Sequence, residues 1–126
     1  MKIFKGEDIS TVTQSGDMAI LYFSRPDCGV CDALRPKIEG MLEDYPEVNS
    51  WFVDLEAHPE LAGHFSIFTI PAVVLFVQGR ETVRYARYLS VDEVEESVAR
   101  YYGLLQIGGR NAVEAHGLRS SFPPSD

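Results

Sequence analysis

The pattern of apolar and polar residues predicts a chain that alternates between strands and helices. Residues 18–24, MAILYFS, are nearly all apolar, as expected of a strand that is covered on both faces of a sheet. Residues 48–55, VNSWFVDL, and residues 72–77, AVVLFV, predict two further buried strands. Residues 82–88, TVRYARY, alternate between apolar and polar positions, which is typical of an exposed antiparallel strand. Residues 2–4 predict a short edge strand.

A long helix is predicted after the first buried strand, because apolar residues recur there at intervals of three and four. Pro36 lies inside this stripe and predicts a kink, and Pro46 ends the helix. A last helix begins after Ser90, which forms a capping-box pattern with Glu93, and extends to Leu105. The apolar stripe of the long helix consists of Cys31, Leu34, Ile38, Met41, Leu42 and Tyr45.

Short helices at residues 8–14 and 58–65 complete the order β-α-β-α-β-α-β-β-α. The first half of this order is that of a parallel α/β unit, and the second half is a hairpin followed by a helix. Residues 1–105 are therefore expected to form one α/β domain. Residues 106–126 are rich in Gly, Ser and Pro and predict a flexible C-terminal tail. We expect a chain that ends at Gln106 to fold and to keep its activity.

The length and the net charge of the chain argue against several classes of function. A chain of 126 residues is long enough for one domain with a buried core. Eleven basic against nineteen acidic side chains give a net charge of −8, which argues against nucleic-acid and anionic membrane partners. The longest apolar run, residues 70–77, is too short to span a bilayer. The N-terminus does not resemble a signal peptide, so a cytoplasmic location is expected, where thiols stay reduced.

The two cysteines of the chain, Cys28 and Cys31, lie three residues apart where a strand passes into a helix. Unpaired N–H groups and the helix dipole meet at such a position and stabilise a thiolate on Cys28. Residues three apart on a helix lie on one face, at a separation that a disulfide accepts. Gly29 allows another chain to approach closely. Cys28 is thus a candidate nucleophile, and Cys31 a candidate resolving thiol.

Two other interpretations of the pair stay open. A zinc site normally needs four ligands, and His58, His64 and His116 show no ligand spacing relative to the pair, so a metal or iron–sulfur cluster would require a dimer that shares two pairs. The two thiols could also be small core residues, although an exposed strand-to-helix junction disfavours this. Redox chemistry is the preferred interpretation.

The chain resembles the thioredoxin family over about residues 18–105. The resemblance is carried by the strand ILYFS, the motif Cys28-Gly29-Val30-Cys31, the helix-internal Pro36, the strand ending VDLE and the segment LAGHFSIFTIPAVVLF. It implies a thioredoxin fold, in which a central mixed β-sheet is flanked by helices in three layers.

The resemblance also implies a role for Ile70-Pro71, which matches the cis-proline signature of the family. A cis peptide bond is essentially a proline feature. In the family this proline packs beside the cysteines, and the backbone of the preceding residue pairs with an extended substrate. Gly29, Val30, Ile70 and Pro71 are therefore the expected substrate-binding residues.

Several positions depart from the family pattern. Asp27 replaces a Trp before the first cysteine, and Val30 replaces a Pro within the motif. Asp27 is expected to oppose ionisation of Cys28. Asp32 stands where a basic residue often follows the motif and is a second candidate for that effect. Arg87 aligns with a family Gly near the site and is either a surface charge or a group that offsets Asp27.

A buried Asp–Lys pair of the family aligns with Tyr22 and Phe52. The family Asp is thought to carry a proton for the buried cysteine, so this route requires a substitute here. Water and the Tyr22 hydroxyl are candidates, although Tyr22 is more simply a core residue. Trp51 is expected in the core.

The function implied is that of a cytoplasmic thiol–disulfide oxidoreductase, a protein-disulfide reductase without a bound cofactor. Cys28 would attack disulfide-containing protein substrates, and Cys31 would resolve the mixed disulfide. A reductase or a small thiol would donate electrons. The alternative from another class is a redox-inactive thioredoxin-like module that binds peptides in a groove around Val30, Ile70 and Pro71.

Overall fold

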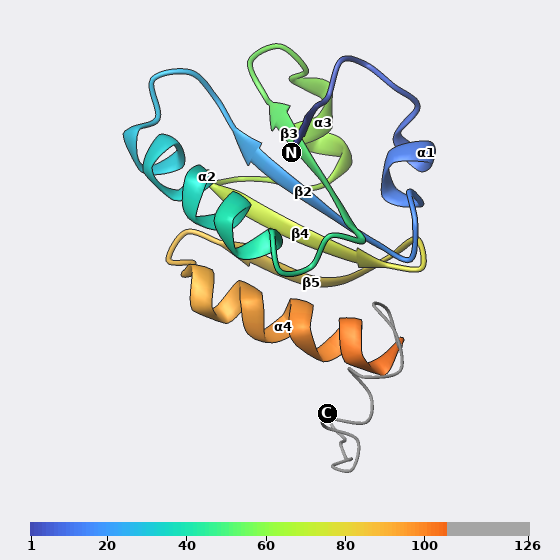
Figure 1. Cartoon of the computed structure of the whole chain (residues 1–126). Helices are drawn as coiled ribbons and strands as arrows, with labels where there is room; N and C mark the ends of the chain where they lie inside the picture. The colour runs from blue at the N-terminus through green and yellow to red at the C-terminus, as the bar shows by residue number, and fades with distance from the viewer. Residues whose placement is uncertain (106–126) are drawn as a thin grey trace.

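A five-stranded mixed sheet runs through the centre of the molecule (Figure 1). The structure, a computed structural model, describes residues 1–105, so the predictions for residues 106–126 lie outside the described residues. The spatial order of the strands is β1 (Lys2–Ile3), β3 (Val48–Asp54), β2 (Met18–Ser24), β4 (Ala72–Val77) and β5 (Arg80–Ala86). Strands β1 and β2 run parallel to β3, whereas β4 runs antiparallel to both β2 and β5.

The element order matches the prediction from the apolar pattern, and the α/β class with a central mixed sheet is confirmed. The helices are α1 (Ile9–Thr13), α2 (Gly29–Leu42), α3 (Glu60–His64) and α4 (Val91–Leu104). Helices α2 and α4 lie against one face of the sheet, and α1 and α3 lie on the other (Figure 1).

Strand β2 is the centre of the core, and all seven of its residues are buried. Successive side chains point to opposite faces of a sheet, so the strand serves both layers. Leu21 and Phe23 pack on the α1/α3 side, whereas Ile20 and Tyr22 pack on the α2/α4 side. The nearly unbroken apolar run predicted this double burial. It holds the C-terminal end of β2, where the cysteine motif begins, between two packed layers.

The ends of the elements differ from the predictions by a few residues. Helix α2 continues through Pro36 but ends at Leu42, so Tyr45 lies beyond it. Strand β5 begins earlier than predicted, because the hairpin turn needs only two residues. Gln78 and Gly79 both have positive φ angles, 52° and 82°, which is typical of the two-residue turn that best fits the twist of a hairpin.

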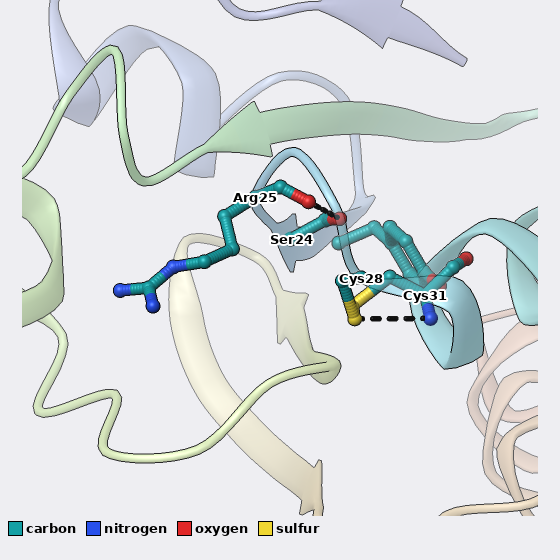
Figure 2. Close-up of a disulfide and its surroundings, with 5 residues drawn as sticks. Ser24, Arg25, Cys28 and Cys31 are labelled. Atoms are coloured by element: carbon teal, nitrogen blue, oxygen red, sulfur yellow. Dashed lines mark hydrogen bonds between the residues drawn. A yellow bond between two sulfur atoms is a disulfide. The ribbon is translucent and has the colours of Figure 1, made fainter.

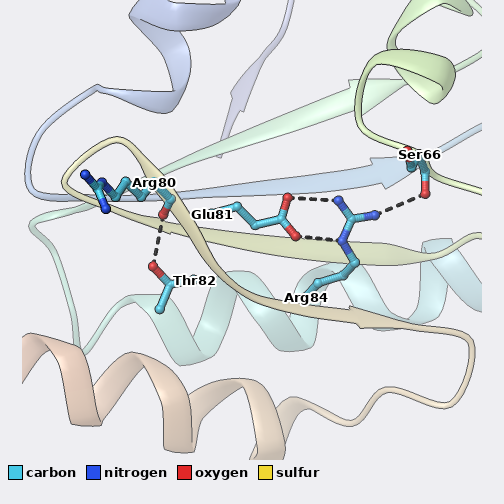
Figure 3. A network of polar contacts seen from close by, with 5 residues as sticks. All are labelled: Ser66, Arg80, Glu81, Thr82 and Arg84. Carbon is cyan, nitrogen blue, oxygen red and sulfur yellow. Dashed lines mark hydrogen bonds and ion pairs between the residues drawn. The ribbon is translucent and has the colours of Figure 1, made fainter.

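Hydrogen bonds of Arg84 connect β5 to the loop that follows α3 (Figure 3). The Arg84 guanidinium donates two hydrogen bonds to the Glu81 carboxylate, at 2.8 and 2.9 Å, and one to the Ser66 carbonyl at 3.1 Å. The hydrogen bonds from Arg84 lower the pKa of Glu81 and raise that of Arg84. The hydrogen bond to Ser66 helps to position the start of the loop that leads to Ile70 and Pro71.

Candidate active site

The cysteine pair lies where β2 passes into α2, as the sequence predicts. Cys28 is the N-cap residue of α2 and has extended backbone angles, φ −109° and ψ 95°. Its sulfur accepts a hydrogen bond from the backbone N–H of Cys31 at 3.2 Å (Figure 2). The two residues form a disulfide with their Cα atoms 5.2 Å apart, so the structure describes the oxidised pair. The geometry required for disulfide exchange within one chain is therefore present.

The two sulfurs differ in accessibility. Cys31 is 1 % exposed, whereas Cys28 is half-buried and Gly29 is exposed. Val30 is 66 % exposed, which is high for an apolar side chain. Cys28 is thus the more accessible sulfur of the pair, and it lies at the N-terminus of α2. Cys31 is shielded behind it.

The segment that contains Pro71 lies at the same end of the sheet as the cysteines. The Ile70–Pro71 peptide bond is cis. Ala72, the first residue of β4, pairs with Phe23 near the end of β2. Ile70 is half-buried and Pro71 is buried. The register therefore brings this segment next to the β2–α2 connection.

Asp27 and Arg87 lie at this end too, one before Cys28 and one after β5. Both are exposed, and both have a positive φ angle, 63° and 65°, in the left-handed region that favours glycine. No ion pair or side-chain hydrogen bond of either residue is found within residues 1–105. Their effect on the acidity of Cys28 stays a prediction.

Tyr22 lies directly beneath the motif. Its side chain is 0 % exposed, and its hydroxyl donates a hydrogen bond to the backbone carbonyl of Cys31 at 2.6 Å. Burial raises the pKa of Tyr22 to about 12, with a smaller opposing effect of the positive charge of Arg35 and a further rise from Asp32. The hydroxyl thus stays protonated near neutral pH. It fixes the first turn of α2 to β2.

Phe52 occupies the second position of the substituted pair. Its ring stacks on that of Tyr22 at a centroid distance of 6.2 Å, and the Arg35 guanidinium lies 4.0 Å above its centroid. A stack of two aromatic rings and a guanidinium thus stands where the resemblance to the family predicts a buried Asp–Lys pair. The apolar pattern did not single out Arg35, because its contact with Phe52 joins helix α2 to strand β3 and depends on tertiary packing.

No cluster of three or more His, Cys, Asp or Glu side chains that could hold a metal ion occurs within the described part of the chain. None of the helices within residues 1–105 has the length and apolar character needed to cross a bilayer.

Comparison with known proteins identifies relatives across most of the chain. The sequence model of the family described as Thioredoxin matches residues 4–100. The thioredoxin-like protein YdfQ of Bacillus subtilis is 34 % identical over 88 residues, which cover 70 % of this chain and 79 % of that protein. The thioredoxin of Chlamydia trachomatis is 26 % identical over 101 residues, covering 80 % of this chain and 98 % of the relative.

Solved structures agree with this result. Thioredoxin 1 of Thermosipho africanus superposes with a TM-score of 0.65 at 29 % identity, over 69 % of this chain and 97 % of that one. The thioredoxin of Fasciola hepatica superposes with a TM-score of 0.72 over 80 % of this chain and 99 % of that one. Its identity is 24 %, so this second likeness concerns the fold.

Proposed function

Because the chain belongs to the thioredoxin family, and its Cys28–Cys31 pair is that of a thiol–disulfide oxidoreductase, we propose that it reduces protein disulfides. The observation that carries the proposal is the arrangement of the pair. An accessible sulfur at the N-terminus of α2 lies in front of a shielded one. That order of accessibility is what nucleophilic attack followed by resolution requires.

The proposed reaction has two exchange steps. The Cys28 thiolate attacks one sulfur of the substrate disulfide, the substrate S–S bond breaks, and the first substrate thiolate leaves and takes up a proton. The Cys31 thiolate then attacks the Cys28 sulfur and releases the second substrate thiolate. The substrate gains two electrons and the pair becomes a disulfide. A dithiol or a reductase must return two electrons for the next cycle.

The residues around the pair have distinct proposed roles. Gly29 and Val30 leave space at the attacking sulfur, and Ile70 and Pro71 form the wall along which a substrate segment lies. Tyr22 is a positioning residue and not a base, since its hydroxyl already donates to a carbonyl. The proton of Cys31 therefore passes to water or to the leaving substrate thiolate. The cytoplasmic location stays a prediction.

The alternative is a redox-inactive peptide-binding module. The feature that favours it is the presence of Tyr22 and Phe52 where the family has an Asp–Lys pair. Reduction of a protein disulfide, with dithiothreitol as electron donor, distinguishes the two. A rate above that of dithiothreitol alone supports the reductase. A rate equal to it, in the presence of measurable peptide binding, supports the module.

Removing the charge of Asp27 is expected to lower the pKa of Cys28, because a carboxylate next to a thiol disfavours the thiolate. Asp27→Asn is the suitable variant, since Asn tolerates the left-handed backbone at this position. A shift of about 0.5 pKa unit, equivalent to about 0.7 kcal/mol, is measurable by thiolate absorbance. Arg87→Gly is expected to raise the Cys28 pKa.

The matched control for these titrations is Arg80→Gly, which removes a charge at the other end of β5. An unchanged titration in Arg87→Gly would make Arg87 a surface charge without influence on the site. A raised pKa in Asp27→Asn would mean that this carboxylate stabilises the N-terminus of α2 instead.

A further inference from the structure

A pocket of about 200 Å³ opens beside the segment that contains Pro71, on the α3 side of the sheet. Its walls come from the end of β3, helix α3, the loop after it, and the connection that follows β2. Arg25 belongs to this connection, and its side chain extends away from the disulfide (Figure 2). The lining residues are Arg25, Leu55, Pro59, Ala62, Ile67, Phe68, Thr69 and Ile70.

One wall of the pocket has free backbone groups. Residues 68–70 make no backbone hydrogen bond to any other residue in the described region, on either their N–H or their C=O groups. Unpaired backbone groups at the surface can pair with an extended peptide, which then lies against the wall as an added strand. The hydrogen bond from Arg84 to the Ser66 carbonyl helps to hold the start of this wall in place.

The size of the pocket suits one side chain. Its volume of about 200 Å³ is below the ~300–1,000 Å³ that is usual for small-molecule sites. It exceeds the ~150 Å³ that admits a benzene ring in an engineered cavity. Phe68 stands at the pocket with 90 % of its side chain exposed, and an apolar side chain bound there would cover part of it. The fitting occupant is an aliphatic or aromatic residue of a peptide.

The charges around the pocket favour a particular charge on the bound peptide. Arg25 is the one charged residue among the lining residues, and its guanidinium has no ion pair or hydrogen bond within residues 1–105. Glu56 and Glu60, both exposed, follow the lining residues Leu55 and Pro59 along the chain. The whole chain carries a net charge of −8. An acidic group is therefore disfavoured over most of the surface but matched at Arg25.

We propose that this pocket is a specificity subsite for the substrate segment that flanks the reacting disulfide. The subsite takes an aliphatic or aromatic side chain, and Arg25 pairs with an Asp or Glu two residues away from it. Residues two apart in an extended peptide lie on the same face, so both can reach the same side of the wall. The proposal rests on the proposed function, because it places a substrate disulfide at Cys28.

Peptide binding tests the subsite without redox chemistry. Extended host peptides would carry Leu-Ala-Asp or Ser-Ala-Asn beside a Ser that replaces the substrate cysteine. Binding to the oxidised protein is measured by fluorescence anisotropy. The Leu-Ala-Asp peptide is expected to bind about three- to tenfold more tightly, the range of one apolar contact and one exposed charge pair. Equal affinity of the two peptides would overturn the proposal.

Two variants and two matched controls assign the preference to the pocket. Arg25→Glu reverses the charge at the pocket, whereas Arg80→Glu makes the same change at the far end of β5. Ala62→Leu fills the pocket, whereas Ala33→Leu adds the same atoms at an exposed position of α2. The preference is expected to weaken in Arg25→Glu, which keeps the apolar contact, and in Ala62→Leu, which keeps the charge pair, and to persist at full size in both controls. If both arginine variants lose it equally, net charge is the cause and the subsite is rejected.

Turnover separates this inference from the proposed function. The same peptides, with their cysteine in a mixed disulfide with 2-mercaptoethanol, are compared with the symmetric disulfide of 2-mercaptoethanol, which has no side chains. Failure to reduce both the peptide disulfides and the symmetric disulfide would reject the reductase and leave the binding result as the test of the subsite. Reduction of all substrates without any preference among the peptides would reject the subsite alone.

Discussion

Cys28→Ser is expected to abolish reduction of protein disulfides, leaving only the rate of dithiothreitol itself. The remaining thiol, Cys31, is 1 % exposed and cannot reach an incoming disulfide. A serine hydroxyl is not a substitute, because the thiolate is the nucleophile of exchange. The measurement is the initial rate of reduction of a protein disulfide with dithiothreitol as donor.

Cys31→Ser is the matched variant and should behave differently. It keeps the attacking sulfur but removes the resolving one, so a mixed disulfide with the substrate should accumulate in a 1:1 complex. Mass spectrometry of the quenched reaction detects it, and dithiothreitol should release it. Full activity of Cys28→Ser would show that Cys28 is not the nucleophile, and trapping by Cys28→Ser in place of Cys31→Ser would reverse the two roles.

Truncation of Tyr22 is expected to give the largest loss of stability near the site. Tyr22→Ala removes a fully buried ring that stacks on Phe52, and such truncations cost about 3–5 kcal/mol. Tyr22→Phe keeps the ring and loses only the hydrogen bond to the Cys31 carbonyl, at a cost of about 0.5–1.5 kcal/mol. Urea unfolding of the oxidised proteins measures both changes.

The pH dependence of the same pair of proteins tests the burial of the hydroxyl. Burial raises the pKa of Tyr22 to about 12 from its ordinary value of 10.0, so the unfolded chain loses this proton at lower pH than the folded protein. The contribution of the buried, protonated hydroxyl to the free energy of unfolding is fully present below about pH 10 and is lost as the pH rises through about 12. The difference in unfolding free energy between the wild type and Tyr22→Phe should therefore shrink between about pH 9 and about pH 11.

An opposite result for Tyr22→Phe would assign the hydroxyl a chemical role. If the variant keeps its stability but loses most of its reductase activity near neutral pH, the hydroxyl carries a proton for Cys31. A small effect on activity, with the expected loss of stability, supports the positioning role.

The sequence predicted those features that depend on local pattern. The unbroken apolar run of β2 indicated burial on both faces, and the change of period after it located the start of α2 at Cys28. The alternation over residues 82–88 indicated an exposed antiparallel strand, which the structure places at residues 80–86. These signals arise from neighbours along the chain, so a single sequence contains them. Helix ends were less accurate, since α2 stops at Leu42 although its apolar stripe continues to Tyr45.

Features that depend on tertiary packing could not be predicted in the same way. The hydrogen bond from Tyr22 joins two elements, and the stack of Arg35 on Phe52 brings α2 over β3. The pocket beside Ile70 combines four separate segments, and only their assembly shows that Arg25 lies among apolar residues. The left-handed backbone at Asp27 and Arg87 was also unforeseen, because neither residue type requires it.

The most direct test of the central claim is a single-turnover transfer of electrons. The protein is reduced, freed of excess dithiol and mixed with an excess of a disulfide-bonded protein under anaerobic conditions. Each molecule is expected to reduce one substrate disulfide, so that two substrate thiols appear while Cys28 and Cys31 form their disulfide. Substrate that stays oxidised while Cys28 and Cys31 keep both thiols would contradict it.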